Sequence, residues 1–224
     1  MNVVEALHQR RSVRAFLPTP VPRETLEALL TDSARAPSGT NIQPWRVRVL
    51  TGQTLQRVVQ KALAAHNDPA INAALQAEYS YYPLTWKSPF IERRRKVGWD
   101  LYGLLGIGKE EKARMHAQHG RNYCFFDAPV GLIFTIDREL TQGAWVDYGM
   151  FLQSLMLAAT ARGLATCPQA AWIHHHAMLS QELQFAPEEM LVCGMALGYE
   201  DPEAVENRLR TERAPVTAFA SFHD

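Results

Sequence analysis

Residues 130–136 read Val-Gly-Leu-Ile-Phe-Thr-Ile, and this stretch marks the centre of the predicted fold. An uncharged run rich in β-branched and aromatic side chains is typical of a strand that is buried on both faces. The segment 146–161 follows soon after, carries Phe151 and Leu155, and predicts a mostly apolar, central helix. We therefore expect the hydrophobic core to form between this strand and this helix.

Shorter elements on both sides of this pair mix strands with helices. Strands are predicted where apolar residues run together or alternate with polar ones, and helices where they recur every three or four residues. Because no strict strand-helix-strand repeat is present, the expected fold class is α+β, with residues 1–224 forming a single domain. The other expected strands are 45–50, 165–167 and 190–197, and the other expected helices are 2–9, 22–35 and 53–65.

Residues 66–120 interrupt this pattern and are predicted to form a mostly helical excursion from the core. The excursion holds Tyr82, Trp86 and the basic run 93–96, Arg-Arg-Arg-Lys. Its aromatic side chains could stack on an aromatic substrate, although core packing would explain any one of them equally well. The basic run is most simply a solvated helix surface. We expect the excursion to supply part of a substrate pocket.

The overall composition argues against several classes of protein. Lysine plus arginine and aspartate plus glutamate both number 23, so the formal net charge is zero and nucleic acid is not expected as a partner. The sequence shows neither an apolar run of about 18 residues nor a secretory signal, so no membrane partner is expected. Three widely spaced cysteines without a CxxC argue against disulfides and zinc, and favour a reducing, cytoplasmic location.

Two groups of histidines raise the question of a metal. His174, His175 and His176 are consecutive, so their side chains do not share a face, and no carboxylate or cysteine completes a metal shell. His116 and His119 share a helical face, which is more often a surface pair. No metal site is therefore expected. The role of the run 174–176 stays open, with the entrance to a substrate pocket as one option.

Two segments carry side chains suited to binding a cofactor. Residues 10–14, Arg-Arg-Ser-Val-Arg, place three guanidiniums and a hydroxyl where a helix ends, and such groups can clamp a phosphate. Residues 37–45, Pro-Ser-Gly-Thr-Asn-Ile-Gln-Pro-Trp, offer amides and hydroxyls to a flat heterocycle rich in donors and acceptors. Taken singly, the first could equally be a solvated basic face and the second an ordinary loop.

Together these segments resemble the FMN-dependent nitroreductase family, in which Arg-Arg-Ser-x-Arg precedes Ala-Pro-Ser-Gly-x-Asn-x-Gln-Pro-Trp. Residues 163–172, Gly-Leu-Ala-Thr-Cys-Pro-Gln-Ala-Ala-Trp, resemble the segment that lies along the flavin, and residues 210–215, Arg-Thr-Glu-Arg-Ala-Pro, resemble the C-terminal phosphate-binding signature. The resemblance covers nearly the whole chain, in the right order, and is greatest for the nitrobenzoate reductase branch. The absence of a G-x-G-x-x-G dinucleotide fingerprint agrees with it.

The resemblance implies an FMN site assembled from all four motifs. Arg10, Arg11 and Ser12 would contact the phosphate and ribityl chain, and Arg14 the N1–O2 edge, where a cation stabilises reduced flavin. No side chain is expected to be catalytic, since a backbone N–H near Ala170 or Ala171 would point at N5. The implied cofactor contacts are Arg10, Arg11, Ser12, Arg14, Pro37, Ser38, Gly39, Asn41, Gln43, Asn122, Pro168, Gln169, Ala170, Arg210 and Arg213.

The resemblance also implies a sandwich of helices around a central mixed or antiparallel sheet, in an intertwined homodimer with FMN at the interface. Ser38 and Asn41 would then come from the partner subunit. NAD(P)H and a small aromatic electron acceptor, such as a nitroaromatic, a nitrobenzoate or a quinone, would exchange two electrons with the flavin in turn, in a ping-pong scheme. Better-known members carry an acidic residue and a glycine near Gln169 and Ala170, so substrate preference is open.

The candidate substrate contacts are Tyr82, Trp86, Arg121 and Trp172, with Arg121 or the basic run as a partner for a carboxylate. Two alternatives stay open. One is a flavoenzyme of the same fold that performs reductive dehalogenation or flavin breakdown. The other is a non-enzymatic flavin-binding regulator, against which the zero net charge counts.

Overall fold

The computed structural model describes residues 1–223, and its centre is a four-stranded antiparallel sheet in the order β1-β2-β4-β3. Strands β2 and β4 lie in the middle and are buried almost throughout, as expected for the apolar run at 130–136. The predicted α+β class is therefore confirmed. The strands are β1 (Arg46–Leu50), β2 (Val130–Asp137), β3 (Ala165–Gln169) and β4 (Glu189–Gly198).

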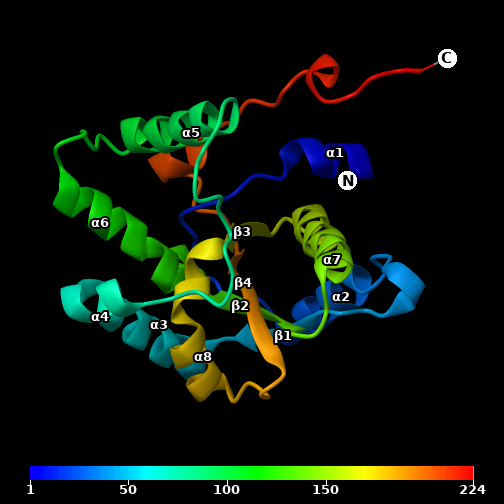
Figure 1. Ribbon diagram of the computed structural model, residues 1–224, viewed down its shortest axis with the longest axis horizontal. Helices are drawn as coiled ribbons and strands as arrows, with labels where there is room; N and C mark the ends of the chain where they lie inside the picture. Colours follow the sequence, from blue (N-terminus) through cyan, green and yellow to red (C-terminus); the bar gives the residue numbers. More distant parts are fainter. Residues whose placement is uncertain (224) are drawn as a thin grey trace.

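Helices cover both faces of this sheet (Figure 1). Helix α7 (Gln142–Ala161) and α2 (Arg23–Ser33) pack together on one face, whereas α3 (Gly52–Asn67) and α8 (His176–Leu183) lie on the other. The remaining α-helices are α1 (Val3–Gln9), α4 (Pro69–Ala74), α5 (Phe90–Leu104) and α6 (Lys112–Gly120). Single-turn or irregular 3-10 segments are η1 (Gly39–Asn41), η2 (Arg121–Asp127), η3 (Ala170–His175), η4 (Val205–Arg208) and η5 (Val216–Ala218).

The alternation of side chains along β2 divides the core into two layers. Leu132 and Phe134 pack toward α7, together with Phe151 and Leu155 of that helix. Ile133 points to the opposite face, toward α3 and the 3-10 segments. Each layer buries a continuous apolar surface because successive strand residues face opposite sides of the sheet. No helix within residues 1–223 is long and apolar enough to cross a membrane.

Helix α7 and strand β3 are among the elements that are longer than predicted. Helix α7 begins at Gln142 rather than near residue 146, and so Ala144 joins the core. Strand β3 continues through Pro168 to Gln169 instead of ending at Cys167. A proline usually ends a strand because it has no N–H to donate, but an edge strand tolerates one. Strand β3 is one of the two edge strands of this sheet, and Pro168 lies opposite Met195.

The excursion at 66–120 contains α4, α5 and α6, as expected, but residues 75–89 form no helix. This segment, called the strap below, passes from α4 to α5 across the end of the sheet (Figure 1). The Tyr79 hydroxyl donates to the Val192 carbonyl at 2.5 Å, and Glu78 pairs with Arg138 at 3.0 Å. The strap is therefore held by tertiary contacts with β4 and with the β2–α7 connection. Such contacts produce no periodic pattern in the local sequence.

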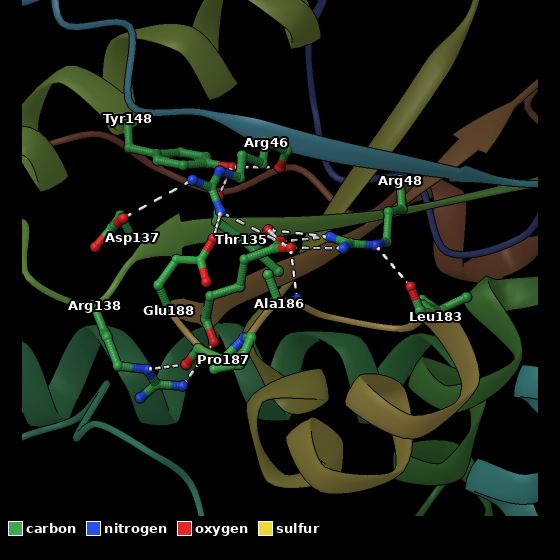
Figure 2. Close-up of polar contacts among 11 residues, drawn as sticks. Arg46, Arg48, Thr135, Asp137, Arg138, Tyr148, Leu183, Ala186, Pro187 and Glu188 are labelled. Atoms are coloured by element: carbon green, nitrogen blue, oxygen red, sulfur yellow. Dashed lines mark hydrogen bonds and ion pairs between the residues drawn. The ribbon is translucent and has the colours of Figure 1, made fainter.

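A polar network closes the end of the sheet beside the strap. Arg48 donates to both carboxylate oxygens of Glu189, at 2.7 and 2.8 Å, and the Thr135 hydroxyl also bonds to this carboxylate. These hydrogen bonds, that of Arg48 foremost, lower the pKa of Glu189 to about 2. Figure 2 shows Arg48 and Thr135 pointing toward the same carboxylate, that of Glu189. Arg138 reaches the Pro187 carbonyl nearby. The network joins β1, β2 and β4 at one point.

Candidate active site

The segment 10–14 leaves α1 and runs alongside the edge strand β3. The Val13 N–H donates to the Thr166 carbonyl at 3.1 Å, and Ser12 and Thr166 form an isolated parallel bridge. Arg10 is the C-cap residue of α1, and its N–H donates to the Ala6 carbonyl. The helix thus ends where the arginines begin, and β3 fixes their position.

Arginines from both ends of the chain line one small cavity of about 60 Å³. Arg11 is already engaged, since its guanidinium pairs with Glu200. In contrast, no carboxylate within residues 1–223 forms an ion pair with Arg10, Arg14 or Arg213. Burial and the neighbouring Arg213 lower the pKa of Arg10. Guanidiniums that face each other without an acid form a site suited to a dianion such as phosphate.

Arg210 and Asn207 support this arginine cluster from the C-terminal side. The Asn207 side chain accepts a hydrogen bond from the Arg14 N–H at 2.8 Å and donates to the Ala15 carbonyl at 2.9 Å. Arg210 donates to the Asn207 carbonyl at 2.9 Å and lines an adjoining cavity of about 250 Å³ with Arg10 and Arg213. The N-terminal and C-terminal motifs are therefore brought together.

Polar groups continue from the arginines along β3. Arg121 donates to the Arg14 carbonyl at 3.2 Å and pairs with Asp127 at 3.2 Å. Gln169 donates to the Asn122 carbonyl at 2.7 Å, and Asn122 donates to the His119 carbonyl at 2.9 Å. Three buried polar atoms of this row have no hydrogen-bond partner among residues 1–223: Thr166 Oγ1, Gln169 Oε1 and Arg121 Nε. Buried polar atoms normally have partners, so these atoms mark where a polar ligand fits.

A large cavity of about 870 Å³ opens at the end of this row. One wall is residues 168–171, and the facing wall is residues 75–82 of the strap. A second cavity of about 410 Å³ adjoins it, between the strap, Pro168–Ala170 and Trp145 of α7. Cavities of this size suit a cofactor ring and a small aromatic molecule together. Asn122, His119 and His174 complete the wall of the larger one.

Of the four predicted substrate contacts, the structure places only Tyr82 in the wall of the large cavity. Tyr82 lines the large cavity, whereas Trp86 packs 5.4 Å from Tyr82 without lining it. Arg121 lies along β3, outside the cavity lining. Trp172 is fully buried, since it stacks on Phe125 and covers Gly194, where a Cβ would lie 2.2 Å from the indole. We therefore replace Trp172 with the strap residues as candidate substrate contacts.

The loop 37–43 lies away from both cavities within one chain. Asp147 of α7 holds it by accepting the Gly39 N–H at 3.0 Å, and Ser38 accepts the Gln43 N–H at 3.0 Å. Positive φ angles at Thr40, Asn41 and Gln43 give the loop a fixed, strained shape. None of Pro37, Ser38, Gly39, Asn41 and Gln43 lines the arginine cavity or the cavity beside Pro168.

Sequence reasoning missed several residues of the cavity wall. Glu78 and Tyr79 belong to the strap, whose irregular backbone gives no periodic signal. His119 shares a helical face with His116, but only the packing of α6 turns its side chain toward the cavity. Asn207 had no motif to identify it, because its role depends on contacts with residues 14 and 15.

An antiparallel sheet between two helical layers, with an arginine cluster along its edge strand, defines an α+β oxidoreductase fold of the kind that the motifs resemble. Comparison with known proteins agrees: the model of the Nitroreductase family matches residues 7–199. A 4-nitrobenzoate reductase of Pseudomonas putida is 41% identical over 213 residues, which are 95% of this chain and 92% of that protein. The chain therefore belongs to the nitroreductase family.

Two solved structures share the whole fold. The FMN and NADPH-dependent nitroreductase NfnB from sphigopyxis sp. strain HMH has 39% identity and a TM-score of 0.95, with 100% of both chains covered. The FMN-dependent nitroreductase NfnB from Mycobacterium smegmatis, solved in complex with NADPH, has 30% identity and a TM-score of 0.92, again with 100% of both chains covered. The predicted family, its branch and the oxidoreductase class are confirmed.

Proposed function

We propose that this protein binds FMN and uses NAD(P)H to reduce nitroaromatic acceptors, including nitrobenzoates, by two-electron transfer. The observation that carries this proposal is the continuous row from the unpaired arginines, along β3, to the cavity beside Pro168. Its two ends have the chemistry that the two ends of a flavin mononucleotide require. The names of the relatives support the same substrate class.

The residues of this row match the parts of FMN in sequence, from the phosphate at one end to the ring at the other. Arg10, Ser12 and Arg213 would hold the phosphate, and Arg14 would lie nearer the ring. Gln169, Asn122 and the backbone at 170–171 would meet the polar edge of the ring, where buried polar atoms lack partners. When bound, FMN supplies the two-electron redox chemistry, and the protein positions the reactants and excludes water.

The strap would form the acceptor side of the cavity. Tyr81 and Tyr82 face each other edge to face at 4.7 Å, and both line the cavity opposite Pro168. Such rings can stack on an electron-poor aromatic acceptor. NAD(P)H would occupy the same space before the acceptor, so one cavity serves both half-reactions.

A homodimer is also part of the proposal. The apolar face of α1 is exposed at Val3, Val4 and Leu7, and the C-terminal segment exposes Phe219 and Phe222. Several large apolar side chains exposed on one helix face and on the C-terminal segment favour a protein partner. A second copy would cover it and would also bring its loop 37–43 to the cavity, which no residue of that loop lines within one chain.

The structure favours nitroaromatic reduction over dehalogenation of a zwitterionic substrate. A strap carboxylate could grip an ammonium group, but Glu78 is engaged by Arg138 at 3.0 Å and by the Leu191 N–H at 3.3 Å. Tyr82 and Glu78 also share no helical face, because the strap is not helical.

Steady-state kinetics test the proposal. Protein supplied with FMN should oxidise NADH or NADPH at a rate that depends on an added nitroaromatic, such as nitrobenzene or 4-nitrobenzoate. The matched control is the double variant Arg10→Ala with Arg213→Ala, which should lose FMN and this activity together. Wild-type protein that holds FMN but oxidises NAD(P)H at the same rate with and without the nitroaromatic would contradict the proposed substrate class.

A further inference from the structure

The wall of the large cavity has an unusual charge pattern. No lysine or arginine of the described residues lines it, although the chain holds 23 of these residues. Glu78, the one acidic residue among the described lining residues, pairs with Arg138 at 3.0 Å, and His176 lies 3.5 Å away. Within residues 1–223, the groups on this wall that can become cationic are therefore His119 and His174.

The two histidines reach the cavity from different elements. His119 lies in the last turn of α6, and His174 lies in η3, directly after the wall formed by residues 168–171. Both residues are exposed, and neither side chain has a hydrogen-bond partner among the described residues. Their ring nitrogens are thus free to bind a ligand in the cavity. The histidines are not arranged to hold a metal in the described part of the chain.

We propose that His119 and His174 form the carboxylate-recognition element of the acceptor cavity, which favours aromatic acceptors with a carboxylate and takes up a proton when one binds. This inference rests on the proposed function, because it assigns the specificity of the same cavity. A carboxylate placed between two imidazoles accepts a charge-assisted hydrogen bond once one of them is protonated.

The surroundings of His119 disfavour its protonated form before an anion binds. Partial desolvation, and then the neighbouring His66, His116 and His174, lower the pKa of His119. Burial lowers the pKa of the neighbouring His175 to about 4, so this second imidazole adds no positive charge beside His119. A bound carboxylate acts in the opposite direction and raises the pKa. The titratable or charged groups around the pair are His66 of α3, His116 of α6, Tyr123 of η2, His175 of η3, His176 of α8 and Glu78, Tyr81 and Tyr82 of the strap.

The other cations near the site are already occupied or lie elsewhere. Arg121 pairs with Asp127 and donates to the Arg14 carbonyl, so it belongs to the row along β3. Arg94 of the basic run stacks over Trp86 at 4.9 Å and over Tyr82 at 5.8 Å, outside the cavity lining. The structure therefore shifts the predicted carboxylate contact from Arg121 and the basic run to the histidine pair.

The first test compares 4-nitrobenzoate with its neutral analogue 4-nitrobenzamide on the FMN-loaded enzyme. We expect the ratio of their kcat/KM values to rise as the pH falls from about pH 8 to about pH 5.5, because the His119 imidazole gains a proton while the carboxylate stays ionised. His119→Gln should lower this ratio about tenfold near pH 6 and flatten its pH dependence, and His174→Gln, which removes the second imidazole from the wall, should also lower the ratio. The matched control Arg94→Gln should leave both unchanged.

A conservative variant guards against a merely structural effect. His174→Lys should keep the preference for the nitrobenzoate over the same range, because lysine stays protonated and still offers the carboxylate a cationic donor. Isothermal titration of the holoenzyme with benzoate, in buffers of different ionisation enthalpy, should show proton uptake that benzamide does not cause. His119→Gln should reduce this uptake.

Two failures are distinguishable. If the enzyme reduces 4-nitrobenzamide but shows no pH-dependent preference for 4-nitrobenzoate, or keeps that preference in both glutamine variants, the histidine inference is overturned and the proposed function stands. Benzoate binding without proton uptake overturns it as well. If neither nitro compound is reduced by protein that retains FMN, the proposed function itself is wrong.

Discussion

Arg10 and Arg213 face the same small cavity from opposite ends of the chain, and neither has an acidic partner there. Arg10→Ala should therefore weaken FMN binding by about tenfold to a hundredfold, since a charge-assisted hydrogen bond contributes about 1.5–3 kcal/mol. Quenching of FMN fluorescence on titration into the apoprotein measures this. The control Arg23→Ala removes an exposed arginine paired with Glu27 and should bind FMN as the wild type does.

Arg14 should act on the flavin potential as well as on binding. Its N–H is fixed by Asn207 and its carbonyl by Arg121, so its backbone position is held on both sides. A cation near N1 stabilises reduced flavin, and its removal in Arg14→Ala should make the midpoint potential more negative. Spectroelectrochemical titration of the bound flavin measures the shift. An unchanged potential in a variant that still binds FMN would refute this role.

Motif order explains why the arginine cluster could be predicted from the sequence, whereas the pairing of His119 with His174 could not. Arg10, Arg14 and Arg213 belong to motifs that indicate a phosphate site only when they are taken together with the resemblance to the family. His119 has no motif, and its exposure to the cavity depends on how α6 packs against η2. The burial of Trp172 depends in turn on Gly194, which lies on another strand and leaves room for the indole.

At the scale of elements, Glu78 anchors the strap. Glu78→Ala removes the contacts with Arg138 and the Leu191 N–H, so the strap should open more often. We expect KM for the acceptor to rise about threefold to tenfold with little change in kcat, as for the loss of a partly exposed ion pair. Trypsin should also cut after the exposed Lys87 more rapidly. The control Glu92→Ala, exposed on α5, should change neither measurement.

The Glu189 network links strand pairing to acid stability. The native pKa of Glu189 is lowered to about 2, so its contribution to stability is complete above the unfolded pKa of about 4.3 and is lost as the pH falls toward 2. Arg48→Met removes the bidentate partner of this buried carboxylate, which keeps only the Thr135 hydroxyl, the Ala186 N–H and the more distant Arg46 at 3.9 Å, and should cost roughly 3 kcal/mol near pH 7. Urea unfolding at several pH values measures both effects. Glu188→Gln, an exposed control, should cost less than about 1 kcal/mol.

Element boundaries followed from local periodicity where the periodicity was strong, as in β2 and α3. The end of β3 was misplaced because a proline is excluded only from strands that donate on both sides, and the edge position of β3 was not visible in the sequence. The excursion at 66–120 was expected to be mostly helical, and within it only the structure shows that the anchors Glu78 and Tyr79 hold the non-helical strap against β4.

At the scale of the whole molecule, the homodimer is the main expectation. Leu7→Glu places a charge on the exposed apolar face of α1, which should convert the dimer to a monomer and weaken FMN binding at the same time. Light scattering after size-exclusion chromatography measures the mass. Leu84→Glu, at an exposed apolar residue of the strap, is the matched control and should stay dimeric. A wild-type protein that is monomeric in the presence of FMN would contradict the expectation.

The α+β architecture was predictable because the buried strand, the apolar helix and the four ordered motifs all indicate the same fold. The resemblance already implied that Ser38 and Asn41 serve the partner's site, but the anchor that holds the loop 37–43, the Gly39 N–H bonded to Asp147, required the structure. Properties of one residue could be inferred from the sequence, whereas relations between distant elements required the structure.

The visible spectrum of the purified protein, recorded without oxygen after addition of FMN and removal of the excess, tests the central claim most directly. The account predicts a bound flavin that is bleached by NADH or NADPH and regains its colour when a nitroaromatic is added. A protein that retains no flavin, or a bound flavin that NADH and NADPH both leave oxidised, would contradict it.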